Sequence, residues 1–401
     1  MNKIRSNDNL LSFNRYNLIP FLDGIDIFLC FSVITNLCIF FFPTLDVRSS
    51  IIVMSFLTLL TFFSRLFSTT LISFFFKIIK KKKINFFLLL SFCYLLPILS
   101  NSNFLILSLI LLVLNRLLIG MFISQINLNY KFSQEFTEKQ TFFVKYFLFF
   151  IIGSLIGNIL FMVINDILSN DELNTWGWKI IFVLLFLINL SFFLFFKITG
   201  KLIYLNYELR DDRVINNSRS DVLVFFKNIF LITPIFLITL FCASKWLPKF
   251  ANPENMQFLD FGLINILLIG LTTLFIYPLI ILVGRKKTSS FLFISVILIS
   301  FISIFFKYNS SYSIDFVKFS LSVVASFSIC LFYLDLKFNN EFNPFQKINI
   351  FNLLFLLNSF LIPLSFYYFI NFSISYNILY LTVGLIYSLS FFISLYVKKT
   401  N

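Results

Sequence analysis

The stretch SRLFSTTLISFFFKIIKKKKINFFLLLSF, residues 64–92, decides the fold of this chain. An apolar run that begins at Ile51 ends within it, four consecutive lysines follow at 80–83, and a second apolar run begins at Ile84. A Lys or Arg at the centre of an inserted helix costs about 2.5–3.5 kcal/mol, and short loops rich in these residues stay on the cytoplasmic side. The stretch therefore predicts a membrane hairpin with a cytoplasmic turn.

The composition supports a membrane protein throughout. Of the 401 residues, 59% are hydrophobic and only 12% are charged, whereas a soluble domain carries about 25% charged residues. The apolar runs are continuous over about 20 residues, which is the length of a membrane helix. The strands of a membrane β-barrel alternate in polarity instead. We therefore predict an all-α polytopic membrane protein.

The apolar runs form two groups of six, which predicts twelve membrane helices in two six-helix bundles. A cytoplasmic N-terminus, a central cytoplasmic loop and a short cytoplasmic tail complete the expected organisation. The first six runs are 18–42, 50–76, 84–100, 104–128, 142–168 and 176–196, and the second six are 222–247, 257–283, 289–306, 314–338, 348–370 and 374–397. The predicted units are 1–17, the N-terminal bundle 18–196, the loop 197–221, the C-terminal bundle 222–397 and the tail 398–401.

Charge distribution sets the expected orientation. With the N-terminus inside, most Lys and Arg residues fall in cytoplasmic loops, as the positive-inside rule requires. We expect both termini in the cytoplasm and the helices in the inner membrane of a cell. The net charge of +14 does not indicate nucleic-acid binding, because the basic residues lie in short loops between spans. The loops on the other side carry only Arg48, Lys179, Lys249, Lys307 and Lys318.

The two groups of runs share one feature. The turn between the second and third runs is basic in both, at Lys80 to Lys83 and at Arg285 to Lys287. Parallel repeats of six spans are the layout of major-facilitator transporters, whose solute site lies between the halves near the midplane.

Four charged residues within the apolar runs are the candidate site. Arg65 and Arg116 lie in mid-span, and Asp23 and Asp26 share one face of the first helix because they are three residues apart. Ionisable residues inside the membrane are functional candidates. We expect Asp26 to pair with Arg116 in the N-terminal half, with Asp23 and Arg65 nearby, and the carboxylate to exchange a proton.

A structural interpretation of the same four residues stays open. If the first helix begins at Asp23, that residue caps it and Asp26 lies in the first turn, where the helix dipole favours an acid. Separately, the two arginines have a structural interpretation of their own, in which Arg65 serves the packing of the second span. Gly153 and Gly157 form a Gly-x-x-x-Gly step that predicts close helix packing.

Other side chains exclude several kinds of site. The sequence has no His, so it offers no imidazole relay or His metal site. The spacing of its five Cys residues resembles neither a zinc site nor a disulfide framework. We expect no cofactor and no metal. Further polar side chains that can face a cavity are Asn115, Gln125, Asn127 and Asn158.

Several of these residues resemble the metabolite:proton symporter branch of the major facilitator superfamily, which includes proline/betaine and α-ketoglutarate permeases. The segment 176–182, WGWKIIF, resembles that branch's Trp-Gly-Trp-Arg-Ile-Pro-Phe, and 23–26, DGID, resembles its Glu-Trp-Tyr-Asp. Arg65 matches the Arg of Arg-Pro-Leu-Gly, and Arg116 matches that of Arg-x-x-Gln-Gly. The resemblance covers 18–196 well and the second half thinly.

The loop motifs depart from the family pattern. The family's Gly-x-x-x-Asp-Arg-x-Gly-Arg-Lys corresponds to 73–82, with Lys77 in place of the Asp, and Ile281 stands where the second half would have an Asp. In the fourth span, Ser-Gln-Ile at 124–126 replaces Gly-Gly-Glu. The resemblance implies gating roles for Lys77, Lys80, Lys81, Arg285 and Lys286.

The function expected from these residues is secondary active transport by alternating access. We expect a monomer in the lipid bilayer, not an enzyme, that couples protons to a small organic solute. The solute would be a zwitterion such as proline or betaine, or a carboxylate. Two alternatives remain: a transport-inactive relic or scaffold of the same fold, and a polytopic membrane enzyme acting on lipid-linked substrates.

Overall fold

The computed structural model describes most of the N-terminal half, up to residue 206, and a few residues of the second half. The predicted gating residues Lys77, Lys80, Lys81, Arg285 and Lys286 lie outside the described residues. The described residues are 17–44, 60–65, 67–68, 83–127, 142–206, 270–271, 291, 294–295 and 297–298.

The first apolar run folds as two consecutive helices, α1 (Leu18–Ser32) and α2 (Ile34–Phe41), separated at Val33. Because α1 begins at Leu18, Asp23 and Asp26 lie inside the helix and not at its start. The alternative in which Asp23 caps the helix is therefore wrong. The apolar residues before Asp23 complete the first turns, so the acids are placed deep in the bundle.

The remaining described helices follow the predicted runs closely. Capping residues explain two of the helix starts: the Asn85 side chain accepts a hydrogen bond from Leu88 N (3.1 Å), and Ser169 forms a capping box with Glu172. The helices are α5 (Phe86–Ile98), η2 (Ser102–Phe104), α6 (Leu105–Asn127), α8 (Phe142–Ile167), α9 (Asn170–Glu172), η3 (Leu173–Gly177) and α10 (Trp178–Ile198). Within the described residues, three stretches are long and apolar enough to cross a membrane, namely Ser102–Ser124, Lys145–Ile167 and Asn170–Ile198.

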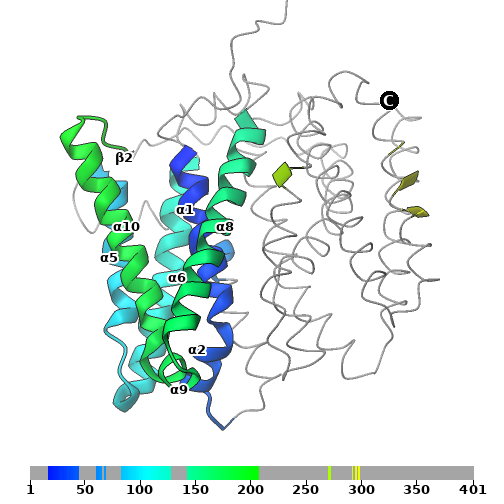
Figure 1. Cartoon of the computed structure of the whole chain (residues 1–401). Coiled ribbons are helices and arrows are strands. Elements are labelled where there is room, and N and C mark those ends of the chain that lie inside the picture. Colours follow the sequence, from blue (N-terminus) through cyan, green and yellow to red (C-terminus); the bar gives the residue numbers. More distant parts are fainter. Residues whose placement is uncertain are drawn as a thin grey trace, which may run out of the picture.

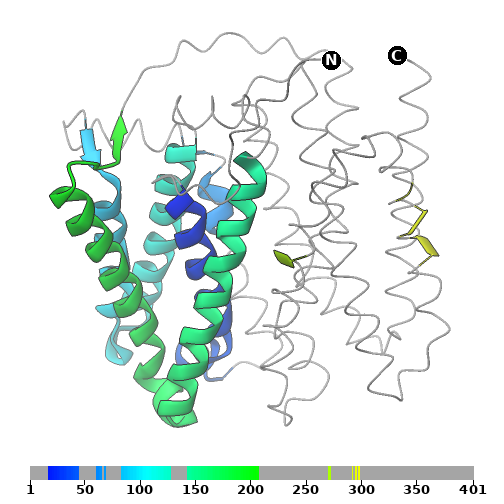
Figure 2. The ribbon, with the colours of Figure 1, turned by 45° about the horizontal axis from the view of Figure 1, so that its top comes forward.

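Two short strands form a ribbon that the sequence did not predict. Strand β1 (Lys83–Asn85) pairs antiparallel with β2 (Tyr204–Asn206), with Lys83 opposite Asn206. Figure 2 shows the two arrows together at one end of the helices. The ribbon holds the last residue of the lysine cluster and the beginning of the central polar stretch at the same end of the bundle. The prediction that both lie on one side of the membrane requires this.

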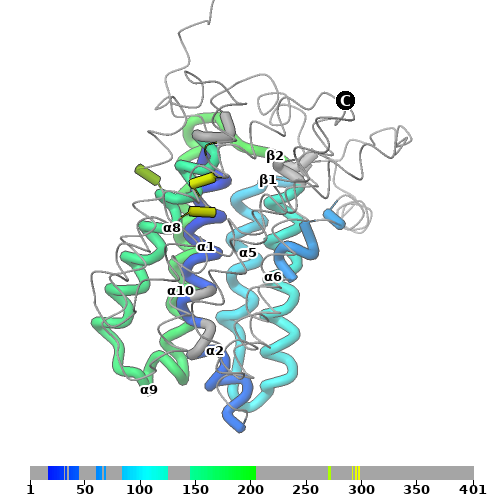
Figure 3. The backbone as a smooth tube through the Cα atoms, turned by 90° about the vertical axis from the view of Figure 1, so that its right-hand side faces the viewer, coloured from blue at the N-terminus to red at the C-terminus, as the bar shows by residue number. Residues whose placement is uncertain are grey.

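Helices α1 and α8 lie side by side (Figures 1 and 3) and meet through glycines. A Cβ on Gly24 would lie 2.1 Å from Phe150 O, and one on Gly153 would lie 2.0 Å from Phe21 O. Neither position has room for a side chain. The two backbones therefore approach as closely as small residues allow.

Aromatic packing joins the other helices. The rings of Phe87 on α5 and Phe196 on α10 stack with centroids 5.4 Å apart. Trp178, at the start of α10, is fully buried and packs edge-on against Phe40 and Phe182. These contacts hold α10 against α5 and against the end of α2, and together with the α1–α8 contact they place α1 beside the polar groups of α5 and α6.

Candidate functional site

The centre of the candidate site is the carboxylate of Asp26, which is 0% exposed. Arg116 on α6 donates two hydrogen bonds to it, from Nη1 to Oδ2 and from Nη2 to Oδ1, each 3.0 Å long. This two-bond geometry matches the planar guanidinium to both carboxylate oxygens and is among the stronger polar contacts in proteins. The structure thus brings together the two residues expected to pair.

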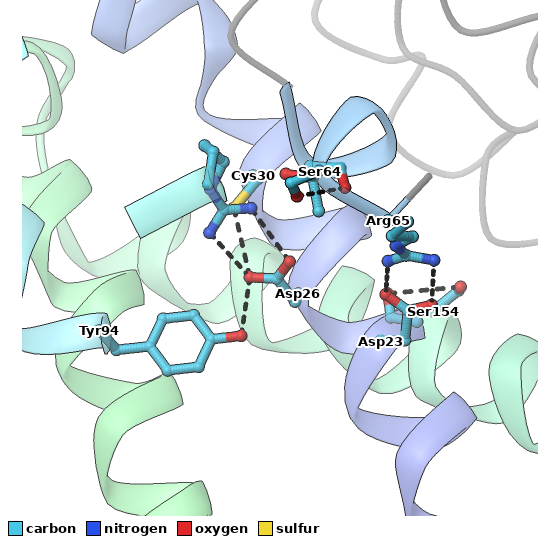
Figure 4. A network of polar contacts seen from close by, with 10 residues as sticks. Asp23, Asp26, Cys30, Ser64, Arg65, Tyr94 and Ser154 are labelled. Carbon is cyan, nitrogen blue, oxygen red and sulfur yellow. Dashed lines mark hydrogen bonds and ion pairs between the residues drawn. The ribbon is translucent and has the colours of Figure 1, made fainter. Parts of the chain in front are cut away.

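Two further donors converge on the same carboxylate, and sequence reasoning missed both. Tyr94 on α5 donates its hydroxyl hydrogen to Asp26 Oδ1 at 2.9 Å, and Cys30 Sγ lies 3.7 Å from the same oxygen (Figure 4). The spacing of Cys30 from Asp26, one helical turn, was a signal for that contact. Tyr94 had no comparable signal, because its partner lies on another helix. Asp26 therefore joins α1 to both α5 and α6.

Neighbouring groups hold Arg116 in this position. Its Nε donates to Asn115 Oδ1 at 2.9 Å, and Asn115 Nδ2 donates to Cys93 O on α5 at 2.8 Å. The guanidinium carbon lies 6.0 Å from the centre of the Phe182 ring. Asn115, one of the polar side chains noted in the sequence, thus serves as a support for Arg116.

The second pair joins Asp23 to Arg65 in the segment 60–65. Arg65 Nη1 donates to Asp23 Oδ2 at 3.0 Å, and Nη2 forms an ion pair with Oδ1 (Figure 4). The Arg65 guanidinium also lies 4.8 Å from the centre of the Phe62 ring. Ser124 on α6 donates to the Arg65 carbonyl oxygen at 2.9 Å, so the segment is held from both sides.

The electrostatic result is a buried group of four charges that sum to zero. Asp23, Asp26, Arg65 and Arg116 are each at most 3% exposed. Buried charges are expensive unless they are paired, and deleting one partner of a buried pair costs about 3–5 kcal/mol because the other charge is left uncompensated. Each acid here has its own arginine, so the network is stable as long as both pairs remain intact.

Two of the other residues singled out in the sequence are glycines of α8. Gly153 contacts α1 as described above, and a Cβ on Gly157 would lie 3.1 Å from Ile25 O. Gln125 and Asn127 belong to the last turn of α6. Within the described residues, no three Cys, Asp or Glu side chains come together as metal ligands.

Comparison with known proteins identifies the fold. No protein-family model and no curated protein matches the sequence. The xylose transporter XylE from E. coli, in a partially occluded inward-open conformation, matches with a TM-score of 0.51 and 13% identity over 92% of this chain and 95% of that one. A D-xylose-proton symporter matches with a TM-score of 0.59 and 14% identity over 94% and 96%.

These matches extend over nearly the whole length of both chains in each comparison. They confirm the predicted fold class, an all-α membrane protein with a major-facilitator-like fold. The predicted arrangement of twelve helices in two six-helix bundles agrees with them.

Proposed function

We propose that this protein is a secondary active transporter that couples a small organic solute to protons by alternating access. The observation that carries the proposal is the fully buried Asp26 carboxylate, held by Arg116 and Tyr94. The matching structures add support, because one is a xylose transporter and the other is a D-xylose-proton symporter. In this proposal the protein lies in the lipid bilayer of the inner membrane as a monomer, with both termini in the cytoplasm.

In this proposal Asp26 is the proton site. While ionised, its carboxylate compensates the charge of Arg116 and ties α1 to α6. A proton on Asp26 removes the negative charge, so Arg116 remains as a buried cation whose compensation has gone. The protonated and ionised states therefore favour different arrangements of α1 and α6. Because proton binding favours one arrangement over the other, it can shift the equilibrium between two conformations of the protein.

Helix α1 can transmit this change because of its packing. One face carries Asp26, and another meets α8 at Gly24 and Gly153. At these glycines the two helices meet backbone to backbone with no side chain between them, and in this proposal α1 shifts along α8 there. We propose that Gly153 and Gly157 serve this movement, and that the basic loops with Lys77, Lys80, Lys81, Arg285 and Lys286 gate the cytoplasmic side.

The charge balance narrows the solute class. Arg65 and Arg116 are each engaged by an aspartate through two contacts, so neither offers an uncompensated charge to an anionic solute. A dicarboxylate would bring net negative charge into a neutral, buried network. We therefore favour a zwitterion such as proline or betaine, or a neutral solute, over a dicarboxylate such as α-ketoglutarate.

The same network argues against a transport-inactive relic or scaffold. Well-packed apolar residues can replace a buried ion pair without loss of stability, so a protein that needs only its fold has no use for two such pairs. Nor does the described part of the chain place the acids where a lipid-linked substrate would reach them, because both are buried between helices.

Proteoliposome uptake tests the proposal. We would measure labelled proline, betaine, D-xylose and α-ketoglutarate with and without an inward proton gradient. Gradient-driven accumulation of at least one neutral or zwitterionic solute is expected, and Asp26→Asn should abolish the accumulation. Arg116→Gln should also abolish it, whereas Cys38→Ser, a buried change on α2 outside the network, should preserve it. Unchanged uptake in both site variants, or no uptake of any solute by correctly inserted protein, would refute the proposal.

A further inference from the structure

Asn158 is a buried polar side chain that the network above does not use. It lies on α8 and is 0% exposed, yet neither its amide nitrogen nor its amide oxygen has a hydrogen-bond partner in the part of the chain that the structure describes. Buried amides are nearly always hydrogen-bonded, because an unpaired buried amide loses its hydrogen bonds to water and gains none within the protein. Among the described residues, nothing uses the donors and acceptors of the Asn158 side chain.

The position of Asn158 on α8 places it at a junction of helices. Ile151, Ser154 and Asn158 are spaced i, i+3, i+7 and so share one helix face. The Ser154 hydroxyl lies 3.5 Å from Gly24 O on α1. A Cβ on Gly270 would lie 3.1 Å from Ile151 Cγ2, and Gly270 belongs to the run 257–283 of the second half. This face of α8 therefore meets both α1 and the second half.

Asn158 is also level with the proton site in the membrane. Helices α1 and α8 run in the same direction, since a Cβ on Gly153 would meet Phe21 and one on Gly157 would meet Ile25. In the same register, Asp26 is opposite Asn158. The Asp26 carboxylate lies on another face of α1, toward α5 and α6. Helix α1 thus separates the charged network from the face that carries Asn158.

We propose that Asn158 is a solute-binding residue at the junction between the two halves. The inference rests on the proposed transport function and adds the chemistry of the ligand. A carboxamide is neutral and offers donors and acceptors at once, so its natural partner is a group with both, such as a hydroxyl. The solute is then a small molecule that presents hydroxyl or comparable neutral groups to Asn158, while Asp26 exchanges the proton across α1.

Kinetics of Asn158→Leu test the proposal, because Leu keeps the size of Asn and removes its polar groups. With D-xylose as the hydroxyl-bearing probe and proline as the second probe, the KM should rise about 5- to 100-fold for whichever solute the wild type takes up. The thermal stability of the variant should be unchanged or higher, since the amide loses no hydrogen bond to any residue that the structure describes. Asn189→Leu on α10 is the matched control for removal of a buried amide, and it should leave the KM unchanged.

A labelling experiment tests the same claim without a solute. A residue that binds a solute must be reached by water in at least one conformation. Asn158→Cys should therefore react with a charged, water-soluble thiosulfonate, whereas Asn189→Cys should not, with labelling read by mass spectrometry of the corresponding peptides. An unreactive Asn158→Cys, or an Asn158→Leu protein with lower stability and normal KM, would overturn the inference alone. Absence of uptake by the wild type would count against the transport function instead.

Discussion

The pairing of Asp26 with Arg116 can be tested through stability, separately from transport. Asp26→Asn leaves the arginine charge buried, and Arg116→Gln leaves the carboxylate charge with the Tyr94 hydroxyl as its strong donor. Each single change should therefore destabilise the protein by about 3–5 kcal/mol. The double variant removes both charges and keeps side chains of similar size, so it should be more stable than either single variant.

The assay is equilibrium or thermal unfolding of the four purified proteins in one detergent. The two single losses taken together would be about 6–10 kcal/mol if they were independent. We expect the double variant to lose much less than this, with a coupling free energy of about 2 kcal/mol or more. A second cycle with Asp23→Asn and Arg65→Gln should behave alike, because that pair has the same two-contact geometry. Additive losses within about 0.5 kcal/mol in both cycles would refute the reasoning.

Three further changes give smaller, local tests. Gly153→Ala places a Cβ 2.0 Å from Phe21 O and should cost about 1–3 kcal/mol in thermal unfolding, whereas Gly157→Ala, with a nearest contact of 3.1 Å, should cost less; equal effects would contradict the close packing of α1 and α8. Tyr94→Phe removes one hydrogen bond to a carboxylate, so about 1.5–3 kcal/mol should be lost in the same assay, and an unchanged unfolding temperature would argue against this contact. Cys30→Ala should cost less than Tyr94→Phe, because Cys30 Sγ is 3.7 Å from Asp26 Oδ1, and a larger loss would show that the thiol matters more than its distance implies.

The sequence predicted the fold and the charged residues of the site for the same physical reason. Charged residues are rare in membrane helices because their burial in lipid is costly, so Asp26 and Arg116 are easily recognised within apolar runs. Two acids and two arginines can form ion pairs in only two ways. The apolar runs predicted the number of helices, and the basic turn that both groups share predicted two repeats of six. Both predictions depend only on residue type and approximate position along the chain, and a single sequence provides both.

The features that were missed depend on details of packing. Tyr94 is one of 16 tyrosines in an apolar chain, and only the meeting of α5 with α1 distinguishes it. The break between α1 and α2 at Val33 could not be predicted, because the sequence has no Gly or Pro next to Val33. The ribbon of β1 and β2 joins residues far apart in the sequence, with three residues in each strand, too few to leave a periodic pattern.

The most direct test of the account is proton movement coupled to the solute. Proteoliposomes containing the wild type would be given proline, betaine or D-xylose without a pH gradient, and the external pH would be followed with an impermeant dye. We predict alkalinisation of the medium with at least one of these solutes in the wild type, and none with Asp26→Asn under the same conditions. Equal alkalinisation by both proteins would contradict the claim that the Asp26 carboxylate carries the proton.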